Sequence, residues 1–162
     1  MIFSTHYGEG SIIHKISCDY VTCHKCVYML LLEAAIIEKL QKKVGATSKL
    51  VASKLNGIVL SDKSKTKADG QLYGTPSQIF DAVAIVLSEE GTNFMLKEDA
   101  AVQWVMDAFG HLKAIGYSEE SLPLLDKAGV VKDEGIVELG KSFINAASKR
   151  FWNREPSVRN LA

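Results

Sequence analysis

The sequence predicts an α/β fold in which a mostly parallel, doubly wound sheet is covered by helices on both faces. Residues 82–87 (AVAIVL) form a continuous apolar run, which is typical of a parallel strand buried on both faces. Strand-like runs alternate with helical patterns of about 10–15 residues, as in βαβ units. The length of 162 residues fits one domain, since domains have about 100–200 residues.

A change of pattern near residue 29 divides the chain. Residues 1–28 show no sustained strand or helix period, so we expect an irregular N-terminal extension there. Residues 29–44 are rich in strong helix formers, with lysines near the end, and predict a deeply buried helix that stops at Gly45. The elements expected next are short strands at 49–52 and 57–60 and a polar turn at 61–70.

The second half of the chain alternates between strands and helices. Val102, Val105, Met106 and Phe109 recur at helical spacing and predict a helix over 99–111. The other expected elements are a helix that starts at Thr75 and Pro76, strands at 82–87, 112–115, 130–131 and 136–139, a helix over 119–128 with Gly129 after its end, and a last helix over 142–151.

One element of a doubly wound sheet has no counterpart in the sequence. Such a sheet normally opens with a strand that leads into the first helix. The stretch before residue 29 is rich in Cys and His instead, so the first strand is missing or replaced. Because an uncovered sheet edge favours association, we expect either that a strand from 1–28 fills the gap or that the chain dimerises or aggregates.

The overall composition excludes several classes of protein. The formal net charge is zero, apolar residues make up 47% and charged residues 23%, which rules out a disordered charged tail, a collagen and a disulfide-dense miniprotein. A neutral chain also disfavours nucleic acid as a partner. The most apolar run, 27–37, is interrupted by Glu33 and is shorter than the ~20 residues that a bilayer requires. We therefore expect a cytoplasmic or other intracellular protein with no membrane partner.

The zero net charge conceals an uneven distribution. Residues 1–70 carry a net charge of +4, residues 71–140 a net charge of −8, and residues 141–162 a net charge of +4. All three arginines, Arg150, Arg154 and Arg159, fall in this last segment. Because a guanidinium pairs well with carboxylates at interfaces, the segment is a candidate docking surface, although a solvated helix end explains the same pattern.

The three cysteines, Cys18, Cys23 and Cys26, lie close together near His14 and His24. Cysteine and histidine are zinc ligands, so this group is a weak candidate metal site. A second paired motif, which structural zinc sites usually show, does not follow it. A redox pair is the other alternative, and free thiols in an irregular extension are the simplest explanation.

The turn from the strand near 112–115 into the next helix is the place to look for a nucleophile. In α/β enzymes of this kind the nucleophile lies on a sharp strand-to-helix turn. The apex position here is Gly116, which has no side chain, and Tyr117 and Ser118 follow it. Ser118 is expected to cap the helix, with Glu119 and Glu120 complementing the helix dipole, and His111 to close the preceding helix. Phosphate-binding glycine motifs are absent from the sequence.

Three stretches carry a resemblance to a known family. They are SDKSKTKADGQLYGTPSQIFDAVAIVLSEEG (61–91), AVQWVMDAFGHLKAIGYSEESLPLLDKAGV (101–130) and KRFWNREPSVRNLA (149–162). In this order and spacing, residues 29–162 resemble the C-terminal domain of large-subunit haem catalases. That domain is similar to flavodoxin-like folds of the class I glutamine amidotransferase-like superfamily. The resemblance thus implies two parts, an unmatched extension at 1–28 and this domain at 29–162.

The resemblance also implies a role. Active members of the superfamily carry a Cys at the position of Gly116, so no catalytic residue is expected in the degenerate turn at Gly116, Tyr117 and Ser118. In catalases, haem binding and peroxide chemistry belong to a separate barrel domain, so no cofactor is expected in this chain. The implied role is a non-catalytic accessory domain, a fragment without the haem barrel; the alternative is a small hydrolase or deglycase of the superfamily.

The resemblance finally implies a partner and a contact surface. In large catalases this domain packs against the barrel, so the expected partner is a catalase core domain or a second copy of the chain. The closing motif of the family contains Phe151, Trp152, Arg154 and Glu155, which are the candidate interface residues.

Overall fold

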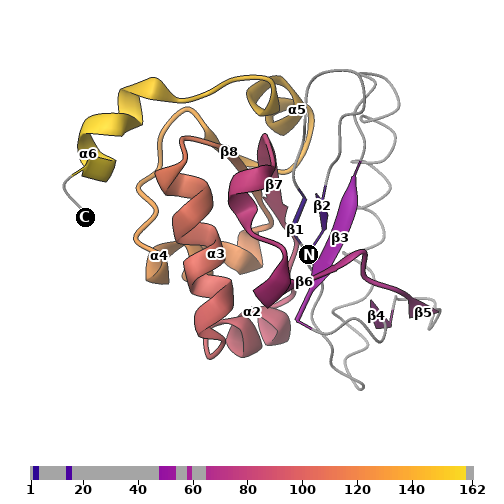
Figure 1. Ribbon diagram of the computed structural model, residues 1–162. Helices are drawn as coiled ribbons and strands as arrows, with labels where there is room; N and C mark the ends of the chain where they lie inside the picture. The colour runs from indigo at the N-terminus through magenta and orange to yellow at the C-terminus, as the bar shows by residue number, and fades with distance from the viewer. Residues whose placement is uncertain (1, 4–13, 16–47, 54–57, 60–64, 160–162) are drawn as a thin grey trace.

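The computed structural model of the chain describes residues 2–3, 14–15, 48–53, 58–59 and 65–159. Its centre is a seven-stranded sheet in the order β1-β3-β2-β7-β8-β9, with β6 paired to β3 (Figure 1). The predicted helix over 29–44 lies outside the described residues. The sheet is mostly parallel and carries helices on both faces, which confirms the predicted doubly wound α/β fold.

The centre of the sheet is formed by three parallel strands. They are β7 (Ala82–Ile85), β8 (Ala114–Tyr117) and β9 (Ile136–Glu138). All residues of β7 and β8 are buried, as the continuous apolar run predicts for a strand covered on both faces. On the other side, β3 (Lys49–Ala52) pairs in parallel with β6 (Gly70–Gln71).

Two short strands occupy the gap between β3 and β7. The first, β2 (His14–Lys15), runs parallel to both neighbours, and β1 (Ile2–Phe3) runs antiparallel to both. Both come from residues 1–28, where the sequence offered no convincing strand. The expectation that a strand from 1–28 fills the gap is therefore confirmed, although two pieces of opposite direction share the position.

The helices of the described chain are short, apart from one. The long helix is α3 (Asp99–Gly110), as its apolar period predicts. The others are α2 (Glu89–Met95), α4 (Leu122–Lys127), α5 (Lys141–Ala147) and α6 (Glu155–Arg159). The sequence did not predict α2, which begins where the Ser88 side chain accepts a hydrogen bond from the N–H of Gly91.

The structure corrects several predicted boundaries. The strand expected at 112–115 begins two residues later, because Leu112 has a φ of 60° and the N–H of Lys113 still donates to the carbonyl of Ala108. These features form the closing turn of α3. Residues 58–59 form β4, which pairs with β5 (Lys65–Thr66) in a separate small sheet. The strand expected at 130–131 is absent from the described structure, where these residues lie in a loop.

Two predicted helices are shorter than the sequence suggested. The helix expected from Thr75 and Pro76 is only a 3-10 turn at Ser77–Ile79, followed directly by β7. The helix expected over 142–151 ends at Ala147, so Phe151 lies outside it. The helix expected over 119–128 starts as a 3-10 turn at Glu119–Ser121 before α4, and Gly129 follows with a φ of 67°, as a helix end requires.

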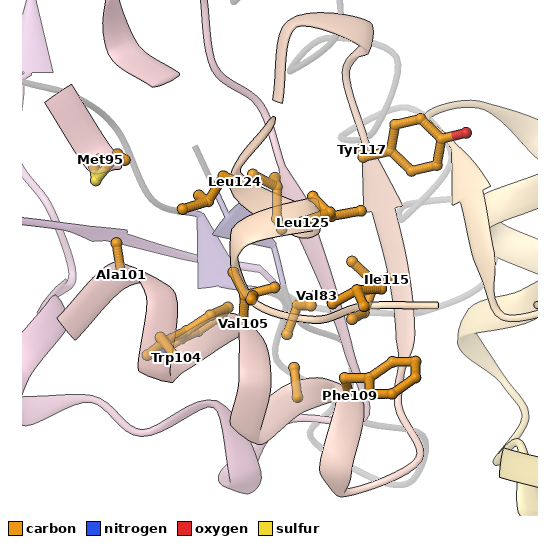
Figure 2. Packing of buried hydrophobic residues seen from close by; sticks show 14 of the residues in the cluster. Val83, Met95, Ala101, Trp104, Val105, Phe109, Ile115, Tyr117, Leu124 and Leu125 are labelled. Carbon is orange, nitrogen blue, oxygen red and sulfur yellow. The ribbon is translucent and has the colours of Figure 1, made fainter. Parts of the chain in front are cut away.

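The alternation of side chains along the strands divides the core into two layers. Val83, Ile85 and Ile115 point to the side of α3 and α4, where Val105 and Leu125 pack against them (Figure 2). On the opposite face the side chains are smaller. Ala82, Ala84 and Ala114 pack there against α5, mainly against Phe143 and Ile144.

Gly116 lies inside β8, and α5 packs closely over it. A Cβ atom added at Gly116 would lie 2.6 Å from a ring carbon of Phe143 and 2.7 Å from a methyl carbon of Leu139. We predict that Gly116→Ala lowers the free energy of unfolding by about 1–3 kcal/mol, the usual cost of overpacking. Urea unfolding measures it. Gly74→Ala is the matched control, because no atom lies within 4 Å of its added Cβ; equal effects at both positions would contradict the prediction.

Candidate functional site

The last described part of the chain runs from the end of α5 across the sheet to α6 (Figure 1, yellow). We call residues 149–159 the C-terminal clasp. The N–H of Phe151 donates to the carbonyl of Leu112 at 3.1 Å. Arg150 donates to both the carbonyl and the carboxylate of Asp81, at 2.7 and 2.9 Å. The clasp therefore binds the residues that lead into β7 and β8.

Arg154 is the most tightly held residue of the clasp. Only 4% of it is exposed, and its guanidinium donates twice to the Asp133 carboxylate, at 2.6 and 2.8 Å. Nη1 also donates to the carbonyls of Phe109 and Lys113 at 3.1 and 3.0 Å. The guanidinium carbon lies 4.3 Å from the Phe109 ring centroid. The side chain thus ties the end of α3, the start of β8 and the loop before β9 to the clasp.

Asp133 is the acidic partner of this arrangement. Its burial acts to raise the pKa of Asp133, but the hydrogen bonds and charge of Arg154 and the N–H of Gly135 outweigh that effect and lower the pKa below its usual value. The carboxylate therefore stays ionised opposite the buried guanidinium. Arg154 is the buried member of the pair, and its charge is stable there because Asp133 and the carbonyls of Phe109 and Lys113 accept its hydrogen bonds.

The other three predicted interface residues differ in how far they are exposed. Phe151 is half-buried against Gly135, where an added Cβ would lie 2.5 Å from a ring carbon. Glu155 is half-buried and forms an ion pair with Arg159. Trp152 is 70% exposed. Of the predicted set, Trp152 therefore offers most of the open surface, whereas Arg154 is buried inside the chain.

A cavity of about 510 Å³ lies between the clasp and the loop at 131–135. Phe109 and Arg154 contribute to its lining, together with Trp152 and with Val131, which is 67% exposed. Its volume suits a small molecule or a partner's side chain. The lining contains no His, Cys, Met or Tyr, the side chains that ligate haem iron, so these residues do not fit a haem.

Lys113 lies beneath the clasp at the start of β8. It is 4% exposed, and its ammonium group donates to the carbonyls of Gln78, at 2.6 Å, and Phe80. The pKa of Lys113 is lowered to about 8, mainly by burial and also by the positive charge of Arg150, while the Asp81 carboxylate partly opposes both effects. Sequence reasoning missed this residue, because a single lysine before a strand carries no local signal of its burial.

The strand-to-helix turn after β8 holds no exposed nucleophile. Gly116 lies within the strand rather than at a turn apex, and Tyr117 is 7% exposed. Ser118 is 3% exposed; its hydroxyl accepts from the N–H of Leu87 and donates to the carbonyl of the same residue. Ser118 does precede the 3-10 turn, but its side chain makes no capping bond there. It instead joins the ends of β7 and β8.

Of the remaining predicted site residues, the described structure includes His111 but not the three cysteines. His111 follows the last residue of α3, and its N–H donates to the carbonyl of Asp107, as expected for the end of a helix. The weak metal candidates Cys18, Cys23 and Cys26 lie outside the described residues. Within the described ranges, no group of three or more His, Cys, Asp or Glu side chains could hold a metal ion. In the same part of the chain, no helix is both long and apolar enough to cross a bilayer.

Solved structures with a similar backbone define the class of fold. Drosophila melanogaster DJ-1beta superposes with a TM-score of 0.62 over 91% of this chain and 95% of its own, at 14% identity. Schizosaccharomyces pombe DJ-1 gives a TM-score of 0.62 over 93% and 97%, at 11% identity. At these identities the likeness shows the fold alone. The chain therefore has the flavodoxin-like α/β fold that is seen in the DJ-1 proteins.

The sequence relatives identify the family that the chain resembles more specifically than the fold does. The chain is 37% identical to Catalase C of Rhizobium meliloti over 133 residues, which cover 77% of this chain and 19% of that protein. It is 30% identical to Catalase-B of Dictyostelium discoideum over 128 residues, 74% of this chain and 18% of that protein. No family model matches the chain. The chain thus spans about a fifth of the length of these relatives, and its predicted resemblance to the C-terminal domain of large catalases is confirmed.

The buried Arg154 gives the first prediction from the site. Arg154→Met leaves the carbonyls of Phe109 and Lys113 without their donor and the Asp133 carboxylate, 31% exposed at its side chain, without its counter-charge, and we expect the free energy of unfolding to fall by about 1–3 kcal/mol. Arg159→Met is the matched control: Arg159 is 76% exposed at its side chain, and an exposed pair contributes about 0–1 kcal/mol. Urea unfolding of both variants checks this. A loss below about 1 kcal/mol for Arg154→Met would show that the pair is not a main contributor to stability.

Lys113 gives a prediction about pH. Its pKa is lowered to about 8 in the folded protein, against 10.5 for the ordinary group. Between pH 8 and pH 10.5 the Lys113 amine is protonated more in the unfolded chain than in the folded protein, so the free energy of unfolding rises with pH. We expect a gain of about 2–3 kcal/mol from pH 8 to pH 10, measured as the difference between the wild type and Lys113→Met. If the free energy of unfolding changes with pH equally in the wild type and in Lys113→Met, the prediction is wrong.

Proposed function

We propose that the chain acts as an intracellular, non-catalytic accessory domain that associates with a haem-binding catalase core. The observation that carries this proposal is the similarity to catalases over three-quarters of the chain, at up to 37% identity. Peroxide detoxification would then belong to the partner protein. Two features of the site support a role without catalysis.

The first feature is the filled space at Gly116, inside β8. The position where an active superfamily member would carry its nucleophile is Gly116, whose Cβ direction is occupied by Phe143 and Leu139. The second is Ser118, the next hydroxyl along the chain. Its oxygen is buried, and both its donor and an acceptor lone pair are engaged with Leu87. A nucleophile needs access to substrate and a base within reach, and Ser118 has neither of these among the described contacts.

The proposed contact surface is the exposed side of the C-terminal clasp. Trp152 is the candidate anchor, because large aromatic side chains that are exposed in the free protein often become central to an interface. Phe151 and Glu155 flank it in the chain. Arg154 has a positioning role in this proposal: it holds the segment that presents Trp152, and it does not itself face the partner.

A separate part of the proposal concerns the structural role of residues 1–28. The expected division at residue 28 separates a part without a match in the catalase resemblance from a part with one. Since β1 and β2 pair with β3 and β7, we propose that the extension replaces the missing first strand and belongs to the same folded unit.

A mixing experiment tests the association. The full chain is combined with the haem-loaded core of a large catalase that lacks its own C-terminal domain, and sedimentation velocity follows haem absorbance. We predict a faster-sedimenting complex at micromolar concentrations, weakened at least about tenfold by Trp152→Ser. Tyr73→Ser is the matched control, because Tyr73 is 69% exposed on a different part of the surface.

Two outcomes would overturn the proposal. Unchanged sedimentation of the core at micromolar chain concentration would remove the proposed partner. Stoichiometric haem uptake by the isolated chain, with rapid oxygen release from peroxide, would show that the chain is itself catalytic.

A further inference from the structure

The cavity beside Trp152 has unused hydrogen-bond donors on three cationic side chains, Lys149, Arg150 and Arg154. Arg154 has five N–H donors, and four of them have acceptors among the described residues, which leaves one on Nη2. Arg150 uses two of its five on Asp81. The ammonium group of Lys149 adds further donors at the same lining and has no partner in the described part of the chain.

The same lining also contains acceptors, on Asp133, Glu134, Asn153 and Ser157. Both carboxylate oxygens of Asp133 accept from Arg154, and its Oδ1 also accepts from the N–H of Gly135. Glu134 is the other carboxylate at the cavity, and it is exposed to solvent. A ligand that offers a carboxylate would meet unused donors from Arg150, Arg154 and Lys149, with repulsion from the solvated Glu134 and from Asp133, whose charge Arg154 balances.

Part of the cavity wall is apolar. The Trp152 indole is 70% exposed and Val131 is 67% exposed, and both line the cavity together with Phe151. Burying a ring between such groups removes apolar surface from water and allows aromatic stacking. The volume of about 510 Å³ is within the range of small-molecule sites, about 300–1,000 Å³.

We propose that this cavity is a binding site for a small aromatic carboxylate, with the ring against Trp152 and the carboxylate toward Lys149, Arg150 and Arg154. The inference does not depend on the proposed catalase partner. Both proposals use Trp152, so the test uses the full chain without any core, and the two can fail separately.

The two tryptophans make the test specific. Trp152 is exposed, whereas Trp104 is 3% exposed and its indole N–H donates to the carbonyl of Thr75. In protein labelled with nitrogen-15 at tryptophan, each indole N–H gives its own signal. We predict that indole-3-acetate shifts the Trp152 signal saturably, with a dissociation constant on the order of 0.1–1 mM, and leaves the Trp104 signal in place.

Charge and site controls complete the experiment. Tryptamine carries the same ring with an ammonium group and should bind at least about tenfold more weakly. Calorimetry should show loss of binding in Trp152→Ser and at least about fivefold weaker binding in Lys149→Glu. Lys141 is exposed and does not line the cavity, so Lys141→Glu should bind as the wild type does. No saturable shift up to about 10 mM, equal binding of tryptamine, or equal shifts at both tryptophans would overturn the proposal.

Discussion

The buried guanidinium of Arg154 sets the constraint on which the C-terminal part of the molecule depends. A buried charge is stable only if a counter-charge and hydrogen bonds replace the water it has lost. Asp133 and the carbonyls of Phe109 and Lys113 provide them from three different elements. Because all three elements must be in place at once, the end of α3, the start of β8, the loop before β9 and the clasp form one unit. The exposure of Trp152 follows from this unit, since the clasp has no freedom to bring its indole inward.

A second constraint acts in the sheet. The four residues of β7 are fully buried, so its backbone polar groups need partners on both sides. On one side β8 supplies a regular parallel register over all four residues. On the other side β1 and β2 supply short pairings of opposite direction. The need to pair buried backbone groups explains how a stretch with no strand pattern comes to lie at the centre of a sheet.

Sequence reasoning succeeded where a local pattern carries the information. The apolar run of β7, the helical period of α3 and the position of Gly129 each depend on neighbouring residues only, and each is confirmed. It failed at α2, whose residues EEGTNFM show no apolar period and include a glycine. It named Arg154 as a candidate interface residue without any sign of its burial, because an arginine in a basic tail has the same local signature whether it is buried or solvated. The resemblance to catalases could be predicted because three stretches of sequence agree in order and spacing.

The sequence by itself determined the fold class, the family resemblance and the segment that carries the arginines. Only the tertiary structure decided which of those residues are open to a partner. It buried Arg154 against Asp133, set Lys113 beneath Arg150, and left Trp152 beside a cavity. The physical reason is that burial and charge pairing here join residues 20 to 70 positions apart, such as Arg154 with Asp133 and Arg150 with Asp81. Periodicity describes neighbours along the chain and carries no information on contacts over such separations.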